Sequence, residues 1–139
     1  METGIEPWRV YYEDTPISIF LSHLKGADHA NFRRFDKFKE DVANNRLPLF
    51  SFIEPRYYDR PKEGKYARDF HPPHNPYLAD ELIQSIYDTL QSNPALSAKT
   101  LLMITFDEHG GFYDHVVPPL LQNARTKELV TCCLKKKLL

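Results

Sequence analysis

"LPLFSFIEP", residues 47–55, is the stretch of sequence that decides the fold. Residues 49–53 are mostly apolar, and such a run predicts a strand that is buried on both faces, as strands of parallel sheets are. The strand is expected to end at Glu54 and Pro55, because proline lacks the N–H group that continues a ladder. Helical and strand patterns alternate along the chain around it, which favours the α/β class.

Two further strands are predicted, one on each side of this run. Residues 8–12, within "PWRVYYED", form a β-rich segment that two acids close. Residues 101–106, "LLMITF", have the composition of a buried strand. Both segments are candidates for neighbours in one sheet.

Three helices are predicted between these strands. Thr15 and Pro16 suit the N-cap and the first turn of a helix that continues to Leu24. Phenylalanines three or four apart predict an amphipathic helix that runs from Phe32 to about Asn45. The third helix lies within residues 78–94. Its apolar stripe comprises Leu82, Ile83, Ile86, Tyr87 and Leu90.

This order of elements predicts a partial, mainly parallel sheet flanked by helices. In such sheets, ligands bind beyond the carboxyl ends of the strands. Acidic residues follow each predicted strand end, and they are Glu13, Asp14, Glu54, Asp107 and Glu108. A functional site is therefore expected at that edge of the sheet.

Composition and charge narrow the functional classes. The 139 residues are 42% apolar and 13% aromatic with a formal net charge of −1, which fits one globular domain without the basic excess of a nucleic-acid binder. No apolar run approaches the roughly 20 residues that span a bilayer. The first ten residues do not form a signal peptide, so the compartment is left open. Cys132 and Cys133 are expected to be free thiols, because adjacent cysteines rarely bridge each other.

"ITFDEHGGFYDHVVPP", residues 104–119, gathers acids and histidines directly after a predicted strand. Asp107 and Glu108 would repel each other when both are ionised, and a shared divalent cation removes that conflict. Neighbouring side chains of a strand point to opposite faces, so these two acids converge only where the strand has ended. Gly110 and Gly111 allow the sharp backbone turn that this requires.

Asp114 and His115 form a second acid–histidine pair in the same segment. The carboxylate would orient the imidazole, as it does beside many metal ions. Alternatively, Asp114 caps a turn and the whole segment is an exposed acidic turn before an aromatic and proline-rich loop. The spacing by itself leaves both interpretations open.

"DFHPPHNP", residues 69–76, places His71 and His74 three residues apart. The prolines between them exclude a helix, so helical ligand geometry does not apply. One interpretation is a surface loop of polyproline type. Another is a hydrolase that uses Glu54 and His71 as an acid–base pair, which requires their side chains to lie within hydrogen-bonding reach.

The segment "TLLMITFDEHGGFYDHVVPP" resembles the signature of the phosphoesterase family, whose members include phospholipases C and acid phosphatases of the alkaline-phosphatase-like superfamily. "WRVYYEDTP", "LPLFSFIEPRYYD" and "DFHPPHNP" follow the family's order and spacing, so the resemblance covers roughly residues 5–119. It implies a fragment of an α/β/α sandwich. It also implies hydrolysis of phosphate esters, phospholipids included, through a metal-activated hydroxyl and a phosphoryl-enzyme.

Residue roles follow from the same resemblance. Asp107 and Glu108 match the acids that bind the active-site divalent metal, whose identity the carboxylates do not fix. His71 matches the histidine that approaches the phosphate. His109 and His115 match signature positions, and His115 is expected to orient a group that contacts the metal.

The sequence also departs from the family pattern. It lacks the Glu-Asn-Arg-Ser-type block that supplies further metal ligands, and the nucleophilic threonine or serine that follows it. Residues 1–119 are therefore expected to be a partial phosphoesterase domain with near-zero turnover, and residues 120–139 an unmatched tail. The alternative is a catalytically silent module that binds a metal or a partner protein. No oligomeric state is predicted.

Overall fold

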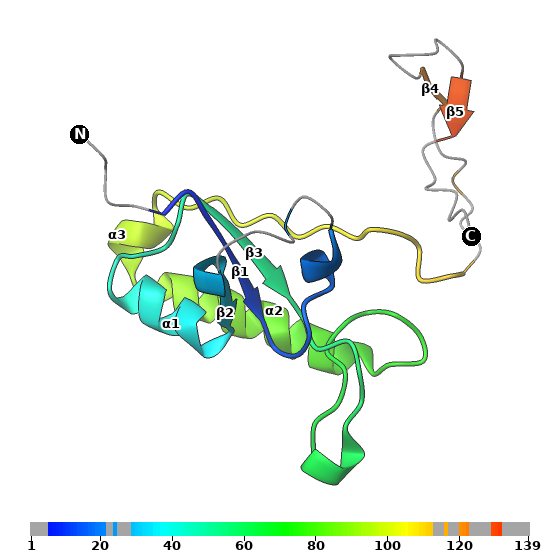
Figure 1. The fold of residues 1–139 in the computed structure, drawn as a ribbon, viewed down its shortest axis with the longest axis horizontal. Coiled ribbons are helices and arrows are strands. Elements are labelled where there is room, and N and C mark those ends of the chain that lie inside the picture. Colours follow the sequence, from blue (N-terminus) through cyan, green and yellow to red (C-terminus); the bar gives the residue numbers. More distant parts are fainter. Residues whose placement is uncertain are drawn as a thin grey trace. The chain divides into compact units, whose positions relative to one another are not determined.

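The computed structural model of the chain describes residues 6–21, 24, 29–112, 116, 120–122 and 129–131. They belong to two compact units, residues 1–103 and residues 104–139, each of which is described by itself (Figure 1). The elements of the first unit are β1 (Trp8–Tyr12), η1 (Ile17–Phe20), η3 (His29–Asn31), β2 (Phe32–Arg34), α1 (Asp36–Ala43), β3 (Phe50–Glu54), η4 (Pro61–Glu63), α2 (Pro76–Gln91) and α3 (Pro94–Ser97). The second unit contains β4 (Leu120–Gln122) and β5 (Leu129–Thr131).

The first unit is built on a three-stranded parallel sheet of order β2-β1-β3. β1 is the central strand, and its Tyr11 stands opposite Ile53 of β3 while Val10 stands opposite Phe32 of β2. The sheet is flanked by helices, which confirms the predicted partial α/β fold. The bounds predicted for β1 are those observed, and β3 lies one residue further along than predicted.

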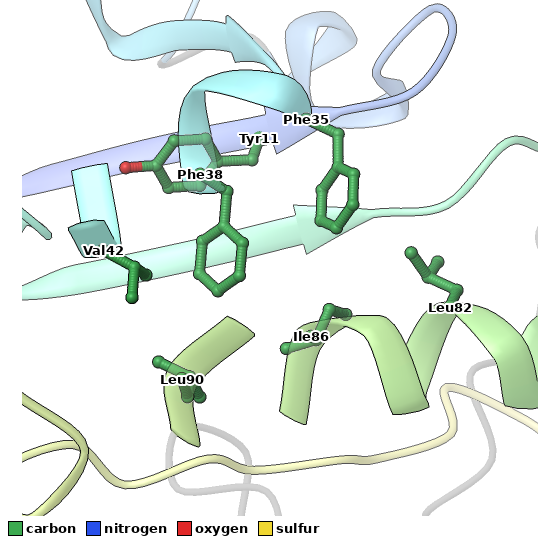
Figure 2. Close-up of a cluster of buried hydrophobic side chains, with 7 residues drawn as sticks. All are labelled: Tyr11, Phe35, Phe38, Val42, Leu82, Ile86 and Leu90. Atoms are coloured by element: carbon green, nitrogen blue, oxygen red, sulfur yellow. The ribbon is translucent and has the colours of Figure 1, made fainter. Parts of the chain in front are cut away.

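Helices α1 and α2 pack against one face of this sheet, and the core lies between them and β1 (Figure 2). The buried cluster comprises Tyr11, Phe35, Phe38, Val42, Leu82, Ile86 and Leu90. The Phe38 ring meets the Tyr11 ring edge-on at 5.5 Å between centroids and stacks on Phe35 at 5.7 Å. Burying one such side chain contributes roughly 1.5–3 kcal/mol, so this cluster is the main support of the unit.

A buried polar group joins the sheet to α1. Asp41 accepts hydrogen bonds at Oδ2 from Arg9 Nη1 and, at 2.7 Å, from the Tyr11 hydroxyl. Burial and then the hydrogen bond to Asp41 raise the pKa of the Tyr11 phenol well above its usual value. Burial lowers the pKa of Arg9, but its hydrogen bonds to Tyr11 and Glu6 more than offset this, so both groups keep their protons.

Side-chain caps fix where the later helices begin. Asn75 precedes α2, and its Oδ1 accepts the Tyr77 N–H at 3.1 Å, while Pro76 fills the first helical position. Asn93 caps α3 in the same way, and its amide also donates to the Val42 carbonyl at 2.8 Å. The chain after α2 is thereby tied to the end of α1.

Two of the predicted helices differ from the observed elements. Among the described residues after Thr15, the structure has the short 3-10 helix η1, since Pro16 before it and Leu21 after it are both extended. Phe32 belongs to β2 instead of the following helix, which starts at Asp36. Its ring packs edge-on against Trp8 at 6.0 Å between centroids, so pairing with β1 overrides the helical spacing of the phenylalanines.

The expectation that β3 is buried on both faces is wrong. Ile53 packs against the core, whereas Phe50 and Phe52 point to the opposite face and are 61% and 47% exposed. Alternate side chains of a strand face opposite sides, so covering by α1 and α2 buries one set and leaves the other open.

The predicted third strand, residues 101–106, is also wrong: it has no strand conformation. Leu101 and Met103 are 84% and 75% exposed. In the second unit, β4 and β5 pair antiparallel with Leu121 opposite Val130, within the residues that the sequence analysis described as an unmatched tail. No described helix combines the length and apolar character needed to cross a membrane.

Candidate active site

The carboxyl ends of β1 and β3 lie side by side and carry three buried acids. Glu13 and Asp14 directly follow β1, and Glu54 is the last residue of β3. The strands remain joined at this point, because Glu13 N–H donates to the Glu54 carbonyl at 3.3 Å. Three of the five acids predicted at this edge are therefore brought together by the parallel sheet.

Glu54 is committed to the backbone of η1. Glu54 is only 1% exposed. Its two carboxylate oxygens accept hydrogen bonds from the backbone N–H groups of Ile17, at 2.6 Å, and Ser18, at 3.1 Å. A carboxylate held this way caps the first turn of η1. Both carboxylate oxygens of Glu54 are thus already engaged by backbone donors of η1, which leaves less accepting capacity for the predicted acid–base pair with His71.

Glu13 and Asp14 hold the loop between β3 and α2. Glu13 Oε1 accepts from Arg68 Nη1 at 2.7 Å, and Asp14 Oδ2 accepts from Tyr57 N–H at 3.1 Å. The second oxygen of each carboxylate, Glu13 Oε2 and Asp14 Oδ1, is buried without a hydrogen-bond partner in the described part of the chain. Much of the acidic character of this edge therefore serves to anchor the loop.

This loop carries η4 and projects away from the sheet before it returns to α2 (Figure 1). Near its end, Arg68 Nε donates to the Leu78 carbonyl at 3.2 Å, which ties the loop to the first turn of α2. Asp69 Oδ1 lies 2.5 Å from His74 Nδ1, and His74 N–H donates to the His71 carbonyl at 3.0 Å. His71 itself is exposed.

The predicted metal-binding acids lie in the second unit. Asp107 and Glu108 are exposed, and Glu108 Oε2 accepts the Gly111 N–H at 3.2 Å and lies 3.9 Å from His109 Nδ1. Gly110 and Gly111 have φ angles of 72° and 79°, in the left-handed region that side chains disfavour. The sharp turn that the sequence predicted after the acids is therefore present.

The donor types of this turn fit a divalent cation, since carboxylate oxygens and imidazole nitrogens are its usual ligands. Across the described ranges, however, no three His, Cys, Asp or Glu side chains are grouped closely enough to hold one. His115, with its neighbour Asp114, lies outside the described residues. The structure thus shows the turn and two candidate ligands, and the full ligand set stays a prediction.

The sequence profile of the Phosphoesterase family matches residues 1–136. The chain belongs to the Phosphoesterase family. The match continues past Pro119, where the sequence placed the end of the partial domain, and that boundary stays a prediction. The two acids, the turn glycines and the histidine loop all lie within the matched range.

The chain is similar in sequence to phospholipases C from a plant and from a bacterium. The chain is 41% identical over 112 residues to non-specific phospholipase C6 of Arabidopsis thaliana, covering 79% of this chain and 21% of the relative. It is 38% identical over 121 residues to non-specific phospholipase C1 of the same plant, covering 86% and 22%. Non-hemolytic phospholipase C of Pseudomonas aeruginosa is 32% identical over 126 residues, covering 81% and 17%. The chain thus spans about a fifth of the length of these relatives.

The sequence analysis missed two side-chain pairs that involve the loop between β3 and α2. One is the ion pair between Arg68 and Glu13, and the other is the contact between His74 and Asp69. The Glu13 pair joins residues far apart in sequence, for which no periodic signal exists. The Asp69 pair spans five residues across two prolines, so neither the helical nor the strand period describes it.

Proposed function

We propose that this chain is part of a phosphoric ester hydrolase of phospholipase C type. It contributes the acidic turn of residues 107–111 and the histidine loop of residues 69–76. The observation that carries this proposal is the sequence "DEHGG" at a left-handed turn within a chain of the Phosphoesterase family. The names of the similar proteins support phospholipid head-group esters as the substrate class. We also place the fold in the alkaline-phosphatase-like superfamily as part of this proposal.

Asp107 and Glu108 are the proposed metal ligands. A divalent cation bound to these carboxylates would supply Lewis-acid stabilisation of charge on the phosphate oxygens. Glu108 already accepts the Gly111 N–H and has His109 at 3.9 Å, so its carboxylate is oriented by the turn itself. We propose that His109 and His115 help to hold these acids in place.

His71 is the proposed contact of the chain with the substrate phosphate. The ring stands on an exposed loop beyond the carboxyl end of β3, the edge at which α/β proteins bind ligands. The loop is held at its base by Glu13, Asp14 and Arg68. These buried contacts would keep the imidazole in one place, which favours orientation of a bound ester.

A segment exchange tests the proposal. The matched segment of Arabidopsis non-specific phospholipase C6 is replaced by the corresponding residues of this chain, and hydrolysis of phosphatidylcholine and p-nitrophenyl phosphocholine is measured. We expect turnover to be retained in the exchange protein. Asp107→Asn should then lower kcat by about 100-fold or more, because a metal ligand is lost.

Asp88→Asn is the matched control for this experiment. Asp88 lies on the solvent side of α2 and accepts from Gln84 Nε2 at 2.8 Å, so the change removes one carboxylate outside the proposed site. We expect its turnover to equal that of the unmodified exchange protein. Full activity of the Asp107→Asn protein would contradict the proposal. Hydrolysis of p-nitrophenyl phosphate with no hydrolysis of the phosphocholine ester would favour an acid phosphatase instead.

A further inference from the structure

A second imidazole of the loop, His74, is held in a defined orientation. Its Nδ1 lies 2.5 Å from Asp69 Oδ1, and both side chains are largely buried, with 21% and 15% of their surfaces exposed. An ionised carboxylate only accepts hydrogen bonds, so Nδ1 is the protonated nitrogen of the pair. Nε2 lies on the opposite side of the five-membered ring and is therefore directed away from Asp69.

The backbone around this pair is fixed on both sides. His74 N–H donates to the His71 carbonyl at 3.0 Å, which closes a four-residue turn that carries both imidazoles. The next residue, Asn75, caps α2, and Arg68 is bonded to Glu13 and to the Leu78 carbonyl. The position of the His74 ring is therefore set by several elements of the first unit.

A carboxylate-held histidine of this kind is suited to an anionic ligand. In the imidazolium form both ring nitrogens donate, so one N–H serves Asp69 and the second, at Nε2, is offered to a phosphate oxygen. Such charge-assisted hydrogen bonds are roughly twice as strong as neutral ones. The turn places His74 on the same short segment as His71.

We propose that His74 is a second phosphate-contacting residue, which donates from Nε2 to an oxygen of the substrate phosphate, and that Asp69 is its positioning residue. The inference rests on the proposed function for the identity of the substrate. It assigns a role to a histidine for which the sequence analysis gave no role beyond a surface loop of polyproline type. The reason for the assignment is the contact with Asp69, which holds the partly buried His74 ring in one orientation.

The test uses the full 139-residue chain and inorganic phosphate, and it reads the histidine ring nitrogens by 15N NMR. We expect the free chain to show His74 with its proton on Nδ1. Saturating phosphate should move the Nε2 resonance of His74 toward that of a protonated ring nitrogen, because the imidazolium that donates to the phosphate takes up one proton, from solvent or from dihydrogen phosphate, as the anion binds. Asp69→Asn should weaken phosphate binding by about tenfold and disturb the ring tautomer, because the charged acceptor is lost.

Two substitutions of His74 separate a contact from mere packing. The amide nitrogen of glutamine reaches the position of Nε2, whereas that of asparagine reaches only the position of Nδ1. We expect both variants to lose the charge-assisted part of the binding, and His74→Gln, which keeps a donor at the Nε2 position, to bind phosphate more tightly than His74→Asn, which should lose about tenfold. Asp88→Asn, the control for Asp69→Asn, should bind phosphate like the unmodified chain.

The inference is overturned if saturating phosphate leaves the His74 resonances in place, if the chain binds no phosphate at millimolar concentration, or if Asp69→Asn and Asp88→Asn bind it equally. Should a His74 variant unfold, as thermal unfolding would reveal, the ring signals of the unmodified chain still decide the matter. Failure of the proposed function has a different signature. It appears as undiminished turnover of the Asp107→Asn exchange protein, whatever phosphate does to His74.

Discussion

Residues 50–54 and residues 101–106 have the same kind of sequence, an apolar run followed by an acid, yet their structures differ. The first run is β3, which pairs with β1 along its whole length and places Ile53 against the core. The second run forms no strand, and Leu101, Met103, Ile104 and Phe106 are exposed. An apolar run therefore becomes a strand here where a neighbouring strand supplies its hydrogen bonds, and composition without that pairing is not sufficient.

The largest expected contrast between the two regions is in amide hydrogen exchange. β1 is bonded on both sides, so its amides should exchange only when the sheet opens, whereas residues 101–106 lack a ladder. We expect the central amides of β1 to exchange roughly a thousandfold or more slowly than those of residues 101–106. Equal protection, measured by NMR, would mean that residues 101–106 are paired after all.

Two phenylalanine truncations sharpen the same comparison. Phe38 is buried between Tyr11 and Phe35, so Phe38→Ala should lower the free energy of unfolding by about 3–5 kcal/mol. Phe106 is 65% exposed, and Phe106→Ala should change it by about 0.5 kcal/mol or less. Urea unfolding of the full chain, followed by circular dichroism, measures both. Similar losses in the two variants would contradict the observed core.

Neighbouring acids of α1 offer a finer test within the first unit. Asp41 is buried and holds Arg9 and Tyr11, so Asp41→Asn should cost about 3 kcal/mol of stability. Glu40 pairs with Lys37 at the surface, and Glu40→Gln should cost about 0.5 kcal/mol or less. Chemical unfolding of both variants checks the difference. A harmless Asp41→Asn would show that the buried group does not join β1 to α1.

The smallest predicted effect concerns alkaline pH. The pKa of Tyr11 is raised by burial and by Asp41, so the unfolded chain loses this proton near pH 10 while the folded chain keeps it. The stabilisation is complete below pH 10 and declines above it, by up to about 1.4 kcal/mol per pH unit. Tyr11→Phe should remove this part of the slope. An unchanged slope in that variant would contradict the assignment.

The sequence predicted those elements whose burial follows a local period. The β-rich run Trp8–Tyr12 is confirmed as a strand, although it is buried at three successive positions, and the apolar stripe of α2 is confirmed for Leu82, Ile86 and Leu90, whereas Tyr87 is 50% exposed. Phe32 shows the limit of this reasoning, because its spacing from Phe35 suits a helix while its partner in the structure is Val10 of β1. Residues 101–106 show the same limit, because strand formation depends on whether another strand lies beside the apolar run, and the composition of the run does not reveal this.

The site was predictable to the same degree. Parallel strands bring their carboxyl ends to one edge, so acids at Glu13, Asp14 and Glu54 were expected to gather, and they do. Their partners were not predictable, because the path of the loop that brings Arg68 to Glu13 has no repeating pattern. The roles of His71, Asp107, Glu108, His109 and His115 stay predictions, and they rest on the family signature.

The central claim is that Asp107 and Glu108 share a divalent cation, and the chain contains its own control. Asp80 and Glu81 are also adjacent acids, but they lie on α2, where consecutive side chains diverge. Substoichiometric Mn2+ added to the full chain broadens the NMR signals of residues close to the bound ion. We predict selective broadening around Gly110 and Gly111 that Asp107→Asn abolishes. Equal broadening around Asp80 and Glu81, or broadening that survives Asp107→Asn, would contradict the claim.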